Sequence, residues 1–112
     1  MKSEKVLEEA LEKVGVPVEY YQYFGTETEY IVYNEEAEEL TNHGDNKPHN
    51  RIIWWQVHIF AQKESEFRSI KKKTEESITE AGFYITDIVT LYEKETRTIH
   101  VVISCNMGET EE

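Results

Sequence analysis

The residues best suited to chemistry lie in one polar stretch, His43-Gly44-Asp45-Asn46-Lys47-Pro48-His49. Imidazole and carboxylate groups are metal ligands, and a loop can fold them around an ion. The stretch lacks the helical His-x-x-x-His spacing that places two imidazoles on one face, and it lacks the alternating Asp/Asn pattern of a calcium loop. A turn-rich hydrophilic loop with two exposed histidines is the better interpretation, so we expect no metal site. A metal-dependent enzyme built on His43, Asp45 and His49 is the minor alternative.

Other candidate catalytic groups are equally weak. The carboxylates of residues 35–39 (EEAEE) sit in a polar run without the burial that shifts a pKa. His58 is a possible base, but no recognisable motif places a Ser or Cys nucleophile beside it. The five glycines occur singly and form no phosphate-binding loop. Cys105 lies in an apolar strand pattern, typical of a small core residue. We therefore expect a protein that is not an enzyme and holds no cofactor.

Charge and length narrow the class of protein further. Against 12 Lys and Arg residues stand 23 Asp and Glu residues, a net charge of −11 that repels phosphate backbones and disfavours nucleic-acid binding. No apolar run approaches the length of a membrane span. The single cysteine fits synthesis at a reducing, intracellular site. At 112 residues, the chain 1–112 is expected to be a single domain with one two-layer core.

The elements that position these residues follow from hydrophobic periodicity. The pattern predicts an α+β fold, an antiparallel sheet of four to five strands with two helices packed on one face, in the order α-β-β-loop-β-α-β-β. A helix begins with Ser3 as its N-cap and stops at Gly15, and a second helix stops at Gly82. The remaining segments are two adjacent strands or a hairpin (18–24 and 30–34), a long flexible polar loop (35–50), a strand (51–62), the second helix (66–81), two strands (83–92 and 98–105) and a disordered acidic tail (106–112).

The strand RIIWWQVHIFAQ, residues 51–62, is apolar on both faces. Alternate side chains point to opposite faces, so one face, with Trp55 at its centre, can bury in the core. It would pack beneath the second helix, whose buried stripe is predicted to be Phe67, Ile70, Thr74, Ile78 and Ala81. The other face carries Trp54 and Phe60, which a small chain has little material left to cover. We therefore expect a protein interface there. Its candidate residues are Trp54, His58 and Phe60 of this strand, Tyr21 and Tyr23 of the first strand, and His43, Asp45 and Asn46 of the loop.

Several short patterns, in their order along nearly the whole chain, resemble one family. They are a leading helix that ends in Gly-Val-Pro-Val (15–18), a tyrosine-rich strand (19–24) and Tyr-Ile-Val-Tyr (30–33). Next come an acidic loop with Asp-Asn-Lys (45–47), a strand with Gln-Val-His-Ile-Phe (56–60), a helix that closes with Glu-Ala-Gly-Phe (80–83), and two final strands. The chain in this respect resembles the small tail-completion proteins of long-tailed bacteriophages and prophages, also called tail terminator or head–tail joining proteins.

The resemblance implies a non-enzymatic structural protein of the virion. Such a protein would form a ring, commonly of six copies, between the tail tube and the head connector. Its partners would be other copies of itself, the tail-tube protein and the head connector protein, with no membrane and no sequence-specific nucleic acid. The alternative is a small non-catalytic α+β module of a bacterial host that binds or regulates another protein through the same face of the sheet.

Overall fold

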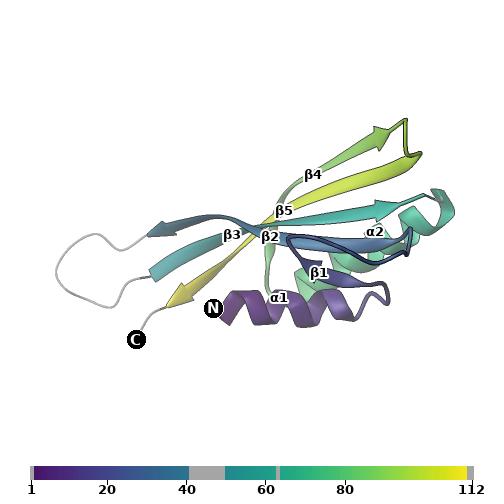
Figure 1. The fold of residues 1–112 in the computed structure, drawn as a ribbon. Helices are drawn as coiled ribbons and strands as arrows, with labels where there is room; N and C mark the ends of the chain where they lie inside the picture. The colour runs from purple at the N-terminus through teal and green to yellow at the C-terminus, as the bar shows by residue number, and fades with distance from the viewer. Residues whose placement is uncertain (1, 41–49, 63, 111–112) are drawn as a thin grey trace.

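The computed structural model describes residues 2–40, 50–62 and 64–110, which form two helices and one five-stranded sheet (Figure 1). Both helices lie on the same side of the sheet, which we call its inner face, and the predicted α+β class is confirmed. Across the sheet the strand order is β1-β2-β3-β5-β4. In chain order the elements are α1 (Lys2–Glu12), β1 (Val18–Tyr20), β2 (Tyr30–Leu40), β3 (Asn50–Ala61), α2 (Glu64–Glu80), β4 (Tyr84–Glu93) and β5 (Thr98–Thr110).

One strand pairing differs from the predicted antiparallel pattern. β1 is three residues long and runs parallel to β2, with Val18 opposite Ile31 and Tyr20 opposite Tyr33. A parallel pair cannot be joined by a tight hairpin and needs a crossover connection. Residues 21–29 provide this connection, and we call them the strap. The other three pairings, β2–β3, β3–β5 and β4–β5, are antiparallel.

The core lies between the helices and the inner face of the sheet. Trp55 at the centre of β3 is fully buried, as the alternation of its strand predicts. Burying a side chain of this kind contributes about 1.5–3 kcal/mol before the entropy cost. The predicted stripe of α2 is also buried, with Phe67, Ile70, Thr74 and Ile78 at 8 % exposure or less. Other fully buried members of the core are Leu7, Leu11, Ile31, Ile53, Val57, Ile59, Val101, Ile103 and Cys105.

The start of α1 differs from the predicted N-cap. The helix begins at Lys2, and the Ser3 hydroxyl accepts a hydrogen bond from the indole Nε1 of Trp55, 3.3 Å away. The backbone N–H of Ser3 donates to Oε2 of Glu109, 3.0 Å away on β5. The first N–H groups of a helix have no partner within the helix, and a carboxylate is favoured there by the helix dipole. Glu109 therefore takes the capping role that we expected of Ser3.

Two segments expected to be irregular are partly strand. β2 continues to Leu40, so residues 35–40 of the predicted loop pair with β3, with a bulge between Glu35 and Ala37. β5 continues to Thr110, so residues 106–110 of the predicted tail also pair with β3. Backbone hydrogen bonds between strands do not require apolar side chains, which is why the polarity of these segments was misleading. Residues 41–49 and 111–112 lie outside the described residues.

The predicted end of α2 at Gly82 is confirmed. Gly82 has φ +101, its N–H donates to the carbonyl of Thr79, and the N–H of Phe83 donates to the carbonyl of Ile78. This pair of bonds is the Schellman arrangement, which satisfies carbonyls at a helix end and needs a left-handed residue. The turn directs the chain from α2 into β4.

Candidate functional site: a pocket on the outer face of the sheet

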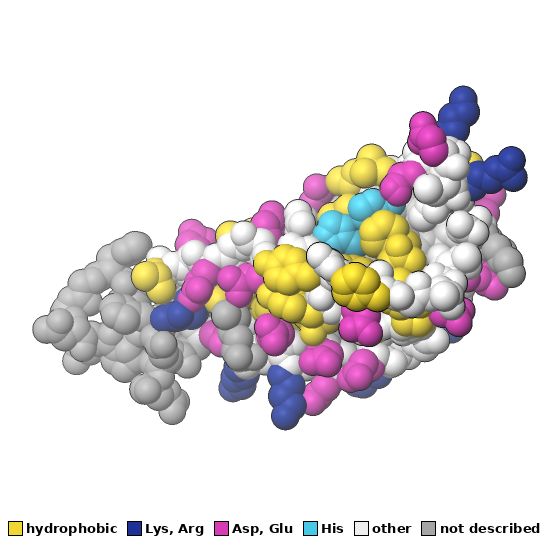
Figure 2. Space-filling model, viewed as in Figure 1, with side chains coloured by type: hydrophobic (Ala, Val, Ile, Leu, Met, Phe, Trp, Pro, Cys, Tyr) yellow, Lys and Arg dark blue, Asp and Glu magenta, His cyan; other side chains and the backbone are white. Residues whose placement is uncertain are grey.

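The face of the sheet opposite the helices, the outer face, carries aromatic and histidine side chains. The strand register places Phe60 of β3 between Tyr30 of β2 and His100 of β5. His58, two residues earlier on β3, lies between Val32 and Val102. Figure 2 shows these kinds of side chain gathered together, with histidine beside hydrophobic groups.

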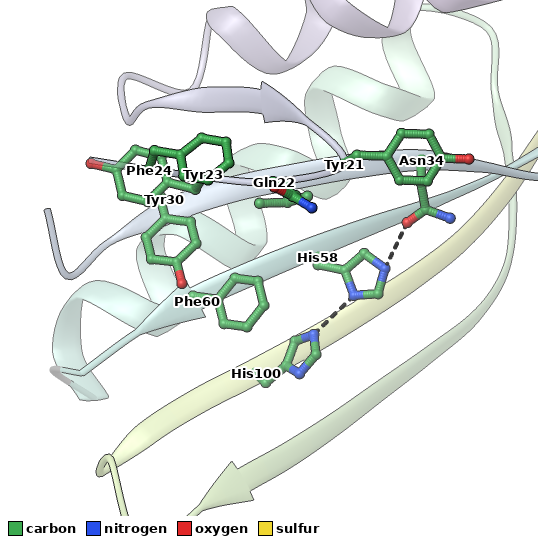
Figure 3. A pocket seen from close by; sticks show the side chains of 10 residues that line it. Tyr21, Gln22, Tyr23, Phe24, Tyr30, Asn34, His58, Phe60 and His100 are labelled. Atoms are coloured by element: carbon green, nitrogen blue, oxygen red, sulfur yellow. Dashed lines mark hydrogen bonds between the residues drawn. The ribbon is translucent and has the colours of Figure 1, made fainter. Parts of the chain in front are cut away.

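The strap and this part of the outer face enclose a pocket of about 480 Å³ (Figure 3). Val32 is only 7 % exposed although it lies on the outer face, because the strap covers the strand there. The strap contributes Tyr21, Gln22, Tyr23 and Phe24, and the strands contribute Tyr30, Val32, Asn34, His58, Phe60 and His100.

A row of stacked rings forms one wall of the pocket. The ring of Tyr23 lies 4.2 Å from that of Tyr30, which lies 4.8 Å from Phe60, which in turn lies 4.2 Å from His100. All three pairs are within 21° of parallel, a favourable geometry for aromatic groups when offset. Phe60 is therefore half-buried by its own chain. The expectation that only a neighbouring molecule would cover it needs correction, because the strap and two adjacent strands cover part of it.

Two histidines and an asparagine form a hydrogen-bonded chain across three strands. Nε2 of His58 lies 3.0 Å from Oδ1 of Asn34, and Nδ1 of His58 lies 2.9 Å from Nε2 of His100. An amide oxygen only accepts, so His58 donates from Nε2, and its Nδ1 accepts the N–H of His100. The Asn34 orientation is supported by its amide nitrogen, which donates to Oε1 of Gln56 at 3.4 Å.

The surroundings of this pair keep both imidazoles neutral. Burial lowers the pKa of His58, and the adjacent His100 lowers it further. Burial also lowers the pKa of His100, against the opposing effect of the Glu93 carboxylate. An ordinary histidine pKa is near 6.5, so at neutral pH the pair offers hydrogen-bond acceptors and carries no positive charge.

Local contacts hold the strap in place over the pocket. The N–H of Tyr21 donates to the carbonyl of Tyr33, and the residue then takes φ +67, which turns the chain out of β1. The hydroxyl of Tyr23 accepts the N–H of Glu27 at 3.0 Å and packs against Gly25. Phe24 points away from the core and is 87 % exposed. The pocket is thus a built feature with an apolar rim.

The structure brings together four of the predicted interface residues. Tyr21, Tyr23, His58 and Phe60 all line the pocket. Trp54 lies on the same outer face but outside the pocket lining, half-buried between Ala37 and Asn106. The loop candidates His43, Asp45 and Asn46 lie outside the described residues.

Sequence reasoning missed Asn34, Tyr30 and His100 as members of this site. The available signal for His100 is alternation, which puts it on the face opposite to Ile99, Val101 and Ile103. The pairing of β5 with β3 was not readable from that alternation, and only this pairing brings His100 to His58.

Neither a metal-binding group nor a membrane-spanning helix is found among the described residues. Within residues 2–40, 50–62 and 64–110, no group of three His, Cys, Asp or Glu side chains is placed to hold a metal ion. In the same ranges, neither helix has the length and apolar character needed to cross a membrane. The pocket itself presents apolar surface and imidazole acceptors, which suits it to bind an apolar side chain.

Comparisons with known proteins show where this fold occurs. Neither a family model nor a curated protein matches the chain. Among solved structures, a chain from the virion of a native gene transfer agent particle is 9 % identical, with a TM-score of 0.62, and the match covers 95 % of this chain and 92 % of that one. At this identity the likeness shows a shared fold. The same fold therefore occurs in a chain of that particle.

Two structures from Akkermansia muciniphila also match. One is 15 % identical over 99 % of this chain and 51 % of the other, with a TM-score of 0.59. The second, described as lacking its transmembrane region, is 14 % identical over 99 % of this chain and 54 % of the other, with a TM-score of 0.52. The chain spans about half the length of these two proteins, so the fold also occurs within longer bacterial chains.

Proposed function

We propose that this chain is a non-enzymatic structural protein of a phage or prophage virion. It forms a ring, of six copies as the family resemblance implies, at the head–tail junction, where it ends the tail tube and joins it to the head connector. The sequence resemblance supports this proposal, and so does the fold shared over nearly the full length with a gene transfer agent virion chain. The chain is made in the bacterial cytoplasm and resides in the virion.

The observation that carries the proposal is the outer face of the sheet, which combines aromatic side chains with a pocket. Tyr21 is 59 % exposed and Phe24 is 87 % exposed at the rim of a pocket whose floor is already apolar. An exposed apolar region of this kind marks a contact with another macromolecule. Each copy in such a ring contacts adjacent copies, the tail tube and the head connector, and these contacts require different surface patches. The outer face supplies one of these patches.

Electron microscopy of tail tubes mixed with the purified chain tests the proposal. Tubes assembled from the tail-tube protein of the same phage or prophage should acquire a cap of density at one end and stop elongating. The variant Phe24→Asp, which charges the rim, should weaken capping. The matched control Tyr92→Asp changes a 62 % exposed aromatic residue on the inner-face side of β4 and should cap normally. Uncapped tubes that elongate equally with and without the chain would contradict the proposal.

The occurrence of the fold within longer Akkermansia muciniphila proteins favours a second candidate, a host protein-binding module. Such a module would use the same outer face on a host protein. The two candidates differ in their neighbouring genes, since capsid, connector and tail-tube genes beside this one support only the virion protein.

A further inference from the structure

The pocket has the shape of a receptor for one protruding apolar side chain. Its floor is formed by Val32 and His58, and the stacked row from Tyr23 to His100 closes one side. On the opposite side lie Tyr21 and Gln22 of the strap (Figure 3). A volume of about 480 Å³ accommodates a large aromatic side chain together with part of its flanking backbone.

Carboxylates lie beside the pocket, and its lining carries no basic side chain. None of the ten side chains that line it is Lys or Arg. Glu19 lies opposite Val32 on β1, whereas Glu27 and Glu29 of the strap line a separate pocket beside α2. Glu93 of β4 is close enough to act on the ionisation of both Tyr30 and His100. Carboxylates beside an apolar pocket favour a positively charged partner.

The histidine pair adds a hydrogen-bond acceptor. With Nε2 of His100 donating to His58, the second ring nitrogen of His100, Nδ1, is an acceptor in the neutral imidazole. No hydrogen bond to this atom occurs within the described part of the chain. A donor such as an indole N–H or an ammonium group on the occupant can satisfy it.

We infer that the pocket binds an apolar side chain flanked by Lys or Arg on a segment of a different protein. This inference rests on the proposed function and assigns the pocket to a neighbour in the particle instead of to a second copy of this chain. The reason is charge. A second copy carries the same net charge of −11, and residues 1–50 hold four basic and twelve acidic side chains. The carboxylates of Glu93 and Glu19 beside the pocket repel an acidic segment and attract a basic one, whereas copies of this chain meet through other patches in the proposed ring.

Three synthetic peptides test the chemistry of the occupant on the intact chain. They are Ac-Gly-Lys-Lys-Trp-Lys-Lys-Gly-NH2, the same peptide with Glu in place of Lys, and the Lys peptide with Ala in place of Trp. The Lys–Trp peptide should bind at least about tenfold more tightly than either of the others at low salt, and added salt should weaken it. Binding should move the imidazole nitrogen resonances of His58 and His100.

Paired variants locate the binding. Phe24→Ala and Gln22→Lys change exposed residues of the strap, so both should fold, and both should weaken the Lys–Trp peptide at least about threefold. Tyr92→Ala, a comparably exposed aromatic residue outside the pocket, should leave the affinity unchanged.

Three results would overturn the inference. They are equal binding of the Glu and Lys peptides, no binding of the Lys–Trp peptide at about 1 mM, and self-association of the chain in sedimentation that is lost in Phe24→Ala. The last result would assign the pocket to a second copy. These outcomes are separable from the proposed function, because a chain that caps tail tubes without binding the peptide contradicts only the inferred occupant. A chain that binds the peptide without capping tubes contradicts only the role in the virion.

Discussion

The indole N–H of Trp55 donates a hydrogen bond to the hydroxyl of Ser3, and both residues are fully buried. The bond links the first turn of α1 to the middle of β3, across 52 positions of sequence. Trp55 is also the largest fully buried side chain of the core. The position of α1 on the sheet therefore depends on a polar contact as well as on apolar packing.

Replacing Ser3 by Ala should destabilise the fold. The substitution leaves a buried indole N–H without its acceptor, which costs about 1–3 kcal/mol. Urea unfolding followed by tryptophan fluorescence measures the loss. The control Ser69→Ala removes an exposed hydroxyl from α2 and should change the free energy of unfolding by less than about 0.5 kcal/mol. Equal effects of the two substitutions would show that the Ser3 contact contributes nothing to stability.

Stability should fall as pH is lowered through the range just below 6.5. The folded pKa values of His58 and His100 lie below the ordinary value of 6.5, so the unfolded chain takes up protons first. Proton uptake by the unfolded state favours unfolding, and the loss ends once pH falls below the folded values. Glu93 opposes the shift at His100 but does not reverse it.

The variants His58→Gln and His100→Gln should each flatten this dependence, because an amide does not titrate. Free energies of unfolding measured from pH 7.5 to pH 5 at fixed ionic strength give the slope for each chain. Imidazole titration by NMR supplies an independent reading, with midpoints expected below 6.5 for both residues. Midpoints above that value would reverse the predicted sign.

Gly82→Ala should destabilise the junction between α2 and β4. A Cβ at φ +101 is strained by about 1–2 kcal/mol, although its nearest contact, Cε of Met107 at 3.5 Å, is ordinary. Gly108→Ala is the matched control, since it lies within β5 without a positive φ and its nearest contact is at 3.9 Å. Thermal unfolding should separate the two, with a lower midpoint for Gly82→Ala alone.

Cys105 should be inert in the native chain. Burial, with a contribution from the carboxylate of Glu36, raises the pKa of its thiol to about 12. The thiolate is the reactive form, so labelling by a disulfide reagent at pH 8 should be at least about a hundredfold slower in the folded chain than in the denatured chain. Fast stoichiometric labelling of the folded chain would show that this part of the core opens readily.

Local patterns in the sequence were sufficient for the order of the helices and strands and for the core, although not for the ends of β1, β2 and β5. Alternation along residues 51–62 identified Trp55 as buried, and a helical stripe identified Ile78, because the positions of side chains on one strand or one helix depend only on its own period. The same alternation placed Phe60 and His58 on the outer face, and Gly82 was correctly identified as a helix stop.

Tertiary structure alone decided which of these residues meet. The parallel pairing of β1 sends the strap across the outer face, and the pairing of β5 with β3 brings His100 to His58 and Glu109 to Ser3. Strand neighbours are chosen by the burial of the whole sheet, not by the residues of one strand, so no local pattern records them. The residues of the core follow from the periodicity of single helices and strands. The pocket exists only because the strap, β2, β3 and β5 lie side by side in the folded chain.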